Sequence, residues 1–281
     1  MDYLVSAIKH LTEGAAPPDA RDLKYSVLHL QAATEVLLKA RLVREHWSLV
    51  FKDPGRATLA KFKSGKFESC TLTSTIERLE NVAQVPIMDA DRKAIEKLSE
   101  TRNALTHYGH TAPAYAVEAS AARVLSFLLD FIHEHLQPSL SKEAADVAQT
   151  MSALRQKLRG IEALVNNRMQ DLGPDLAAFT SRTVECPACF QWTLVTGELP
   201  LRCRFCLATW DDPGTAAAEY GWMIRGEGDF LGLKGCPVCS SHFTVGLANR
   251  VTDKETDVAL CFECGTVFEK VIPEEPPTDA A

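Results

Sequence analysis

The sequence predicts a multidomain protein, with an all-α helical bundle in its N-terminal part and a small β-rich region in its C-terminal part. Two observations support this fold class. Apolar residues recur at helical spacing up to about Gly173, whereas from Thr183 onward short β-prone runs alternate with pairs of cysteines. An apolar content of 46% with only 24% charged residues supports folded cores. We therefore place the domain boundary between residues 173 and 182.

Amphipathic helices are expected along the whole N-terminal part. In the longest early helix, Leu30, Ala33 and Leu37 lie on one stripe, which is typical of a helix packed into a bundle. In the last helix the apolar residues step by three or four positions, close to a heptad pattern. A bundle helix explains this pattern, and a short coiled coil between subunits is the alternative. The expected helical ranges are residues 2–12, 22–50, 71–82, 89–107, 116–136 and about 142–172.

The charge is distributed unevenly between the two parts. The whole chain has a net charge of −7, and the residues from 183 onward carry seven Lys/Arg against fifteen Asp/Glu, which gives −8. The N-terminal part, with 23 Lys/Arg against 22 Asp/Glu, is close to neutral at +1. This balance argues against a wholly electrostatic nucleic-acid binder. It favours a protein partner for the acidic C-terminal part.

The N-terminus MDYLVSAIKH lacks the long apolar core and the cleavage site of a signal peptide. The apolar stretches carry charges throughout, so we expect no membrane partner and no membrane span. Nine cysteines in such a chain indicate a reducing compartment, in which thiols serve metal binding rather than disulfides. We expect a cytoplasmic location.

Eight of the cysteines form four Cys-x-x-Cys pairs. Two residues between cysteines make a tight turn that directs both sulfurs toward one ion, and two such turns complete a tetrahedron. The spacers between the paired turns are 13 and 21 residues long, enough for a β-hairpin in each site. We expect two zinc ions, and iron in a rubredoxin-like site remains open as the alternative. The expected metal ligands are Cys186, Cys189, Cys203, Cys206, Cys236, Cys239, Cys261 and Cys264.

These segments resemble tandem zinc ribbons, the first over residues 183–212 and the second over 230–272. Because all four ligands of each site are protein sulfurs, no position is open for water or substrate, and the zinc is expected to be structural. The tail 273–281 is rich in proline and acidic residues and is expected to be disordered. Four aromatic residues either fill the small ribbon cores or stack on nucleic-acid bases. They are Phe190, Trp192, Phe205 and Trp210.

The segment ETRNALTHYGH, residues 100–110, ends the helix expected over 89–107. Asn103 and His107 are four residues apart and share a helix face, and the long side chain of Arg102 can reach the same face. Arginine binds phosphate oxygens through a planar fork, and histidine transfers protons near neutral pH. These three residues are therefore the candidate catalytic set for a phosphodiester. A structural role is the alternative, in which Arg102 pairs with Glu96 or Glu100 and His107 caps the last turn of the helix.

Residues 20–137 resemble a HEPN domain, a helical bundle with an R-x4-H motif, here Arg102 to His107. The long helix SVLHLQAATEVLLKARLVREHW, with Glu35 amid apolar residues, is similar to the long helix of that family. The resemblance implies a metal-independent ribonuclease that forms a homodimer, so that two motifs make one cleft. Arg102 would stabilise the scissile phosphate of a single-stranded RNA, His107 would transfer a proton, and Asn103 would assist.

Two functions are compatible with these features. The first is a HEPN-type endoribonuclease, a toxin or defence effector, whose zinc ribbons serve recognition or docking. The second is a non-catalytic dimeric adaptor whose ribbons bind a protein or nucleic-acid partner. In the first case a cluster of basic residues in the loop 51–70 would guide RNA, and a solvated loop is the alternative. The cluster consists of Arg56, Lys61, Lys63 and Lys66.

Overall fold

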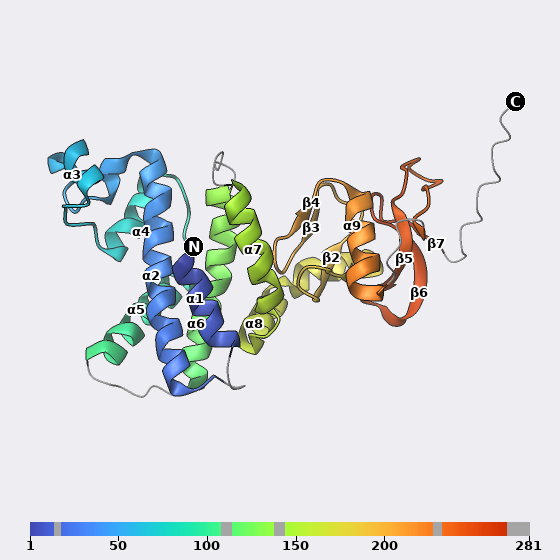
Figure 1. The fold of residues 1–281 in the computed structure, drawn as a ribbon, viewed down its shortest axis with the longest axis horizontal. Helices are drawn as coiled ribbons and strands as arrows, with labels where there is room; N and C mark the ends of the chain where they lie inside the picture. Colours follow the sequence, from blue (N-terminus) through green and yellow to red (C-terminus); the bar gives the residue numbers. More distant parts are fainter. Residues whose placement is uncertain (14–17, 108–113, 138–143, 227–231, 269–281) are drawn as a thin grey trace, which may run out of the picture. The chain divides into compact units, whose positions relative to one another are not determined.

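The computed structural model describes residues 1–13, 18–107, 114–137, 144–226 and 232–268. The chain divides into two compact units (Figure 1). The first comprises Met1–Leu154 with Gly160–Leu164, and the second comprises Arg155–Arg159 with Val165–Ala281. The first unit is helical and the second contains an antiparallel sheet with the cysteine pairs. The predicted fold class is therefore confirmed.

The helical unit is arranged around α2 (Ala20–Glu45), which contacts α1, α4, α5 and α6 (Figure 1). The apolar stripe of α2 explains this position, because Val27, Leu30 and Leu38 are fully buried. Asp19 caps the helix, its carboxylate accepting from the Asp22 N–H at 2.8 Å. The surrounding helices are α1 (Asp2–Thr12), α3 (Leu59–Ser64), α4 (Leu72–Asn81), α5 (Asp89–His107) and α6 (Ala114–Phe131), with short turns η1 (Trp47–Val50), η2 (Pro54–Arg56) and η3 (Ile132–Leu136).

The long helix ends five residues earlier than the sequence predicts. His46 adopts an extended backbone, with φ −162° and ψ 135°, and breaks the helical hydrogen bonding after Glu45. Its ring Nδ1 then accepts from the Ser48 N–H at 3.3 Å and starts the short turn η1. The remaining predicted residues up to 50 belong to this turn rather than to α2.

The sequence predicts one helix over about 142–172, whereas the structure has α7 (Ala144–Leu158) and α8 (Glu162–Leu176). The interruption falls at residues 159–161 and includes Gly160. Glycine lowers helix stability by about 1 kcal/mol relative to alanine, so a break is favoured there. The apolar residues on both sides, Leu158 and Ile161, are buried, which explains why the heptad-like pattern continues across the break.

The second unit contains one seven-stranded antiparallel sheet, in the order β4-β3-β2-β1-β5-β6-β7. The strands of the two cysteine-bearing halves meet at β1 and β5, where Val184 is the partner of Arg250 and the Val251 N–H donates to the Thr183 carbonyl at 2.9 Å. The two halves therefore share one sheet. The strands are β1 (Thr183–Glu185), β2 (Trp192–Val195), β3 (Leu201–Cys203), β4 (Thr209–Trp210), β5 (Val245–Arg250), β6 (Asp253–Cys261) and β7 (Val267–Phe268).

Helical turns flank and connect the strands. The turn η5 (Ala177–Arg182) leads into β1, and α9 (Pro213–Tyr220) with the π-helical turn η6 (Gly221–Arg225) lies between β4 and β5 in the chain. Tyr220, 1% exposed, packs its ring on Phe262 and accepts a hydrogen bond from the Asn249 N–H at 3.1 Å. The helix α9 was not among the predicted elements. The tail expected to be disordered, 273–281, lies outside the described residues.

Candidate metal centres and candidate active site

The four Cys-x-x-Cys pairs close the same backbone turn. In each, the first cysteine carbonyl accepts from the N–H of the residue after the second cysteine, at 2.8–3.0 Å. The first cysteine N–H in turn donates to the carbonyl of the residue two positions beyond the second cysteine, at 2.8–2.9 Å. Four copies of one turn therefore present sulfurs in the same way, as the spacing predicts.

Each turn places a residue in the left-handed backbone region, directly after its second cysteine. The φ angles are 60° at Phe190, 60° at Leu207, 62° at Ser240 and 71° at Gly265. Only Gly265 adopts this conformation without strain, and each of the other three costs on the order of 1 kcal/mol. Three of the four turns therefore carry backbone strain in the conformation that directs their sulfurs inward. The free energy of metal binding can offset such strain.

The sulfurs gather into two groups of four, within each of which the ligand atoms lie within 4.8 Å of one another. In the first group Cys186 and Cys206 are 3.9 Å apart, and Cys189 and Cys203 are 3.7 Å apart. The second group repeats this, with 3.7 Å for Cys236–Cys264 and 3.8 Å for Cys239–Cys261. Four ligands at a Zn–S distance of about 2.3 Å form a tetrahedron with edges of about 3.8 Å. The distances are far longer than a disulfide bond of about 2.05 Å. Both groups are compatible with one zinc ion each.

Hydroxyl groups approach the sulfurs in both groups. Thr193 Oγ1 lies 3.1 Å from the Cys203 sulfur, and Thr244 Oγ1 lies 3.4 Å from that of Cys261. Hydrogen bonds of this kind orient thiolate ligands and stabilise their charge. Sequence reasoning did not single out these residues. A sequence signal for such hydroxyl groups exists only in the second group, where Ser241 and Thr266 each stand two positions after a Cys-x-x-Cys pair. Ser241 contacts the Cys239 sulfur at 3.0 Å, and Thr266 contacts the Cys264 sulfur at 3.1 Å.

The surroundings shift the thiol pKa values in different directions. Burial raises the pKa of Cys186 well above its ordinary value, and burial raises the pKa of Cys261 to about 12. The hydrogen bond with Ser241 lowers the pKa of Cys239 to about 7. The raised pKa values keep Cys186 and Cys261 protonated at neutral pH when no metal is bound, so metal binding must release these protons.

The aromatic residues of the ribbons are mostly occupied by packing within the unit. Phe205 is fully buried and Trp210 is 8% exposed, so both fill the core. The guanidinium of Arg159 lies 4.5 Å from the centre of the Phe190 ring, and the ammonium of Lys254 lies 4.9 Å from that of Trp192.

The candidate catalytic residues lie in the last two turns of α5. Arg102 and Asn103 are both exposed, and Arg102 Nη1 donates to Asn103 Oδ1 at 2.8 Å. Within the described part of the chain, Arg102 makes no ion pair with Glu96 or Glu100. His107 is the last residue of α5, one turn after Asn103, and its side chain lies outside the described residues. The structure therefore brings Arg102 and Asn103 together, and the role of His107 stays a prediction.

The basic cluster belongs to a more ordered segment than the predicted loop. Thr58 caps α3, which carries Lys61 and Lys63, both exposed. The segment is anchored by stacking of Phe51 on Phe67, with ring centres 4.1 Å apart. The remaining basic side chains, Arg56 and Lys66, are also exposed, and Arg56 lies 3.4 Å from the Asp53 carboxylate.

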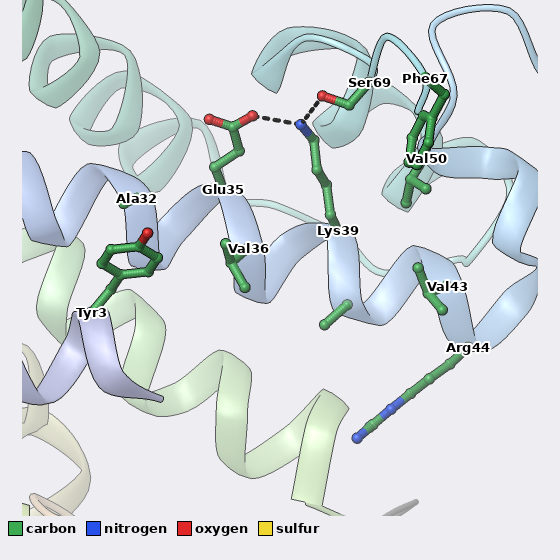
Figure 2. A pocket seen from close by; sticks show the side chains of 11 residues that line it. Tyr3, Ala32, Glu35, Val36, Lys39, Val43, Arg44, Val50, Phe67 and Ser69 are labelled. Atoms are coloured by element: carbon green, nitrogen blue, oxygen red, sulfur yellow. Dashed lines mark hydrogen bonds and ion pairs between the residues drawn. The ribbon is translucent and has the colours of Figure 1, made fainter. Parts of the chain in front are cut away.

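A cavity of about 650 Å³ lies along α2, apart from the predicted sites (Figure 2). Lys39 donates to the carboxylate of Glu35 and, at 2.9 Å, to Ser69 Oγ. Glu35, the acidic residue on which the resemblance to HEPN domains partly rests, is thus held in an ion pair with Lys39 at this cavity. The lining is otherwise mainly apolar and is formed by Tyr3, Ala32, Val36, Ala40, Val43, Arg44, Val50 and Phe67.

Comparison with known protein families, curated proteins and solved structures finds no match for this chain. Among the described residues, no helix combines the length and apolar character needed to cross a membrane.

Proposed function

We propose that the chain is a metal-independent endoribonuclease of the HEPN type, and that its two cysteine clusters hold structural zinc ions in ribbons used for recognition or docking. The observation that carries the proposal is the exposed Arg102–Asn103 pair one helical turn before His107. An exposed guanidinium that has no carboxylate partner among the described residues is available for a phosphate group.

In the proposed reaction the 2′-oxygen of a single-stranded RNA attacks the adjacent phosphorus, and the bond to the 5′-oxygen of the next nucleotide breaks. His107 takes part in moving the 2′-hydroxyl proton, and a proton must reach the leaving 5′-oxygen. Arg102 stabilises the charge on the phosphate oxygens, and Asn103, bonded to Arg102, holds the guanidinium in place. The products are a cyclic phosphate and a 5′-hydroxyl.

The ribbons contribute structure rather than chemistry to this function. Each cluster supplies four sulfurs at tetrahedral separations, so bound zinc would have no open position. The acidic charge of this part of the chain favours docking of a protein partner. A cytoplasmic location and a homodimer with a shared cleft belong to the same proposal.

The test is cleavage of single-stranded RNA by the zinc-loaded protein without added metal. Arg102→Ala and His107→Ala are each expected to lower the rate by at least about 100-fold, the usual scale for a proton-transfer or charge-stabilising group. Lys97→Ala is the matched control, because it removes an exposed cation from α5 without touching the Arg102–Asn103 pair. Mass spectrometry should find the cyclic phosphate end. Full cleavage by both variants would exclude the site.

A non-catalytic adaptor is the second candidate, and the surface of the second unit favours it. Trp222, Val238 and Phe243 are 64%, 63% and 64% exposed, and aromatic side chains are enriched in protein–protein interfaces. Under this function the folded protein leaves RNA intact. The Arg102→Ala variant would then bind its partner with the same affinity as the unchanged chain.

A further inference from the structure

The two cysteine clusters differ in how far they are buried. All four cysteines of the first cluster, Cys186, Cys189, Cys203 and Cys206, are 0% exposed. In the second cluster Cys236 and Cys261 are buried, whereas Cys239 and Cys264 are only half-buried. A chelator or an oxidant must reach a sulfur or the ion itself. Access therefore differs between the clusters.

Helical arginines contact the first cluster. Arg155, in the last turn of α7, donates from Nε to the Cys206 carbonyl at 3.2 Å and from Nη2 to the Leu207 carbonyl at 3.4 Å. Arg168 on α8 is 4% exposed and donates to the Arg204 carbonyl at 3.4 Å. All these bonds end on one cysteine turn, residues 203–207. That turn is thereby tied to two helices.

The described contacts of the second cluster come instead from neighbouring strands and loops. Hydroxyls of Ser241, Thr244 and Thr266 approach its sulfurs, and Gly197 packs on the turn that ends at Cys264. Arg182 passes beside Gly265, but its guanidinium is engaged by the Glu198 carboxylate at 3.3 Å and by the Gly197 carbonyl. This turn is therefore held by its own sheet.

We propose that the second cluster releases its metal before the first, and that metal in the first cluster holds α8 and the last turn of α7 through Arg168 and Arg155. The inference rests on the proposed zinc occupancy. Leu207, in the turn 203–207, has a φ of 60°, and this strain favours opening of the turn when no ion fixes Cys203 and Cys206. Once that ion leaves, the carbonyls that accept from the arginines are no longer held in position.

The experiment uses the full chain. Elemental analysis first establishes the zinc content, and a chromogenic chelator then follows zinc release while hydrogen exchange is measured across α8. We expect two phases of one ion each. The fast phase should leave exchange in α8 unchanged, and the slow phase should increase it. Cys264→Ser should remove the fast phase alone.

Arginine variants test the link to the helices. Arg168→Gln and Arg155→Gln are expected to accelerate the slow phase about 10- to 100-fold, the scale found for groups that support metal ligands. Arg225→Gln is the control. Arg225 pairs with Asp257 of β6 at 2.7 Å, and three strands separate β6 from β3, which carries Cys203 of the first cluster. One simultaneous phase, a reversed order, or an α8 insensitive to the slow phase would overturn the inference. Absence of zinc would instead refute the metal part of the proposed function.

Discussion

The backbone of Gly197 lies directly against the carbonyl group of Cys264. Gly197 has a φ of 82°, and its N–H donates to the Phe262 carbonyl at 3.1 Å. A Cβ at this position would lie 2.9 Å from both the carbonyl carbon and the carbonyl oxygen of Cys264. The loop after β2 therefore packs on the last cysteine turn and links the first ribbon to the second. Only glycine fits both the backbone angle and the close approach.

Gly197→Ala is expected to lower the free energy of unfolding of the second unit by about 3 kcal/mol, because left-handed strain and overpacking add. Urea unfolding of the zinc-loaded chain, followed by tryptophan fluorescence, measures the loss. Gly226→Ala is the matched control. Its φ is 70° but no atom lies within 4 Å of the added Cβ, so only the strain of about 1 kcal/mol should remain. Equal losses in the two variants would show that contact with Cys264 is unimportant.

Zinc content provides the second prediction. The purified chain should carry two zinc ions, because each four-sulfur group has tetrahedral separations. Cys203→Ser and Cys261→Ser should each lower the content to one ion by elemental analysis, since a site with three sulfurs binds zinc far less tightly. Cys70→Ala should retain both ions, because Cys70 is buried in the helical unit. Iron in place of zinc, or unchanged content in the serine variants, would contradict this assignment.

The third prediction concerns pH and the contact between α1 and α2. Burial lowers the pKa of His29 below 6.5, and the neighbouring His10 lowers it further. The His29 Nδ1 also hydrogen-bonds with Ser6 Oγ at 2.8 Å. A histidine whose folded pKa is depressed favours the folded state above the unfolded pKa and loses this contribution as pH falls toward the folded pKa. Stability of the helical unit should therefore decrease as pH falls below about 6.5.

Urea unfolding at pH 7.5 and at pH 5.5, followed by helical circular dichroism, measures this dependence. His29→Gln cannot titrate and should reduce the pH-dependent loss. His133→Gln is the control, because it removes a histidine of the helical unit that hydrogen-bonds with Gln137 and not with a residue of α1. A loss that is identical in the His29 variant and the unchanged chain would assign the pH dependence to other groups, such as His135, whose pKa burial also lowers.

Features fixed by local covalent geometry could be predicted from the sequence. A Cys-x-x-Cys pair permits few backbone paths, so the grouping of sulfurs followed from spacing alone. The bounds of α1 and α5 followed from apolar periodicity and the acidic first turn of α5. For the candidate catalytic residues, the sequence indicated a shared helix face but not the bond between Arg102 and Asn103. No spacing rule predicts a contact between adjacent side chains.

Features set by non-local pairing could not be predicted. The strands β1, β3 and β7 are two or three residues long, too short for an alternating pattern to be visible. The pairing of Val184 with Arg250 joins the two halves into one sheet across a long stretch of chain. The arginines that contact the first cluster come from α7 and α8, far before Cys203 in the sequence. In the sequence, the apolar residues around Arg155 and Arg168 predicted only that these helices pack, and not that the two arginines bond to a cysteine turn.

The helix α9 is different, because the sequence contained a local signal for it. Asp212 followed by Pro213 is a typical helix start, with a capping carboxylate and a proline in the first turn. The Asp212 carboxylate accepts from the Thr215 N–H at 2.8 Å and from the Thr215 hydroxyl at 2.6 Å. These bonds lower the pKa of Asp212. The signal was obscured by its position between two cysteine-rich segments.

Asp212→Ala is therefore expected to lower the free energy of unfolding of the second unit by about 1 kcal/mol, the usual cost of losing an N-terminal cap. Because α9 places Tyr220 against Phe262, the loss should appear in the cooperative transition of the sheet rather than as local fraying. Asp211→Ala is the matched control, since it removes the adjacent exposed carboxylate without touching the cap. Asp212→Asn should retain most of the stability, because its amide oxygen still accepts from the same N–H groups. Equal effects of Asp211→Ala and Asp212→Ala would mean that charge, rather than capping, matters at this helix start.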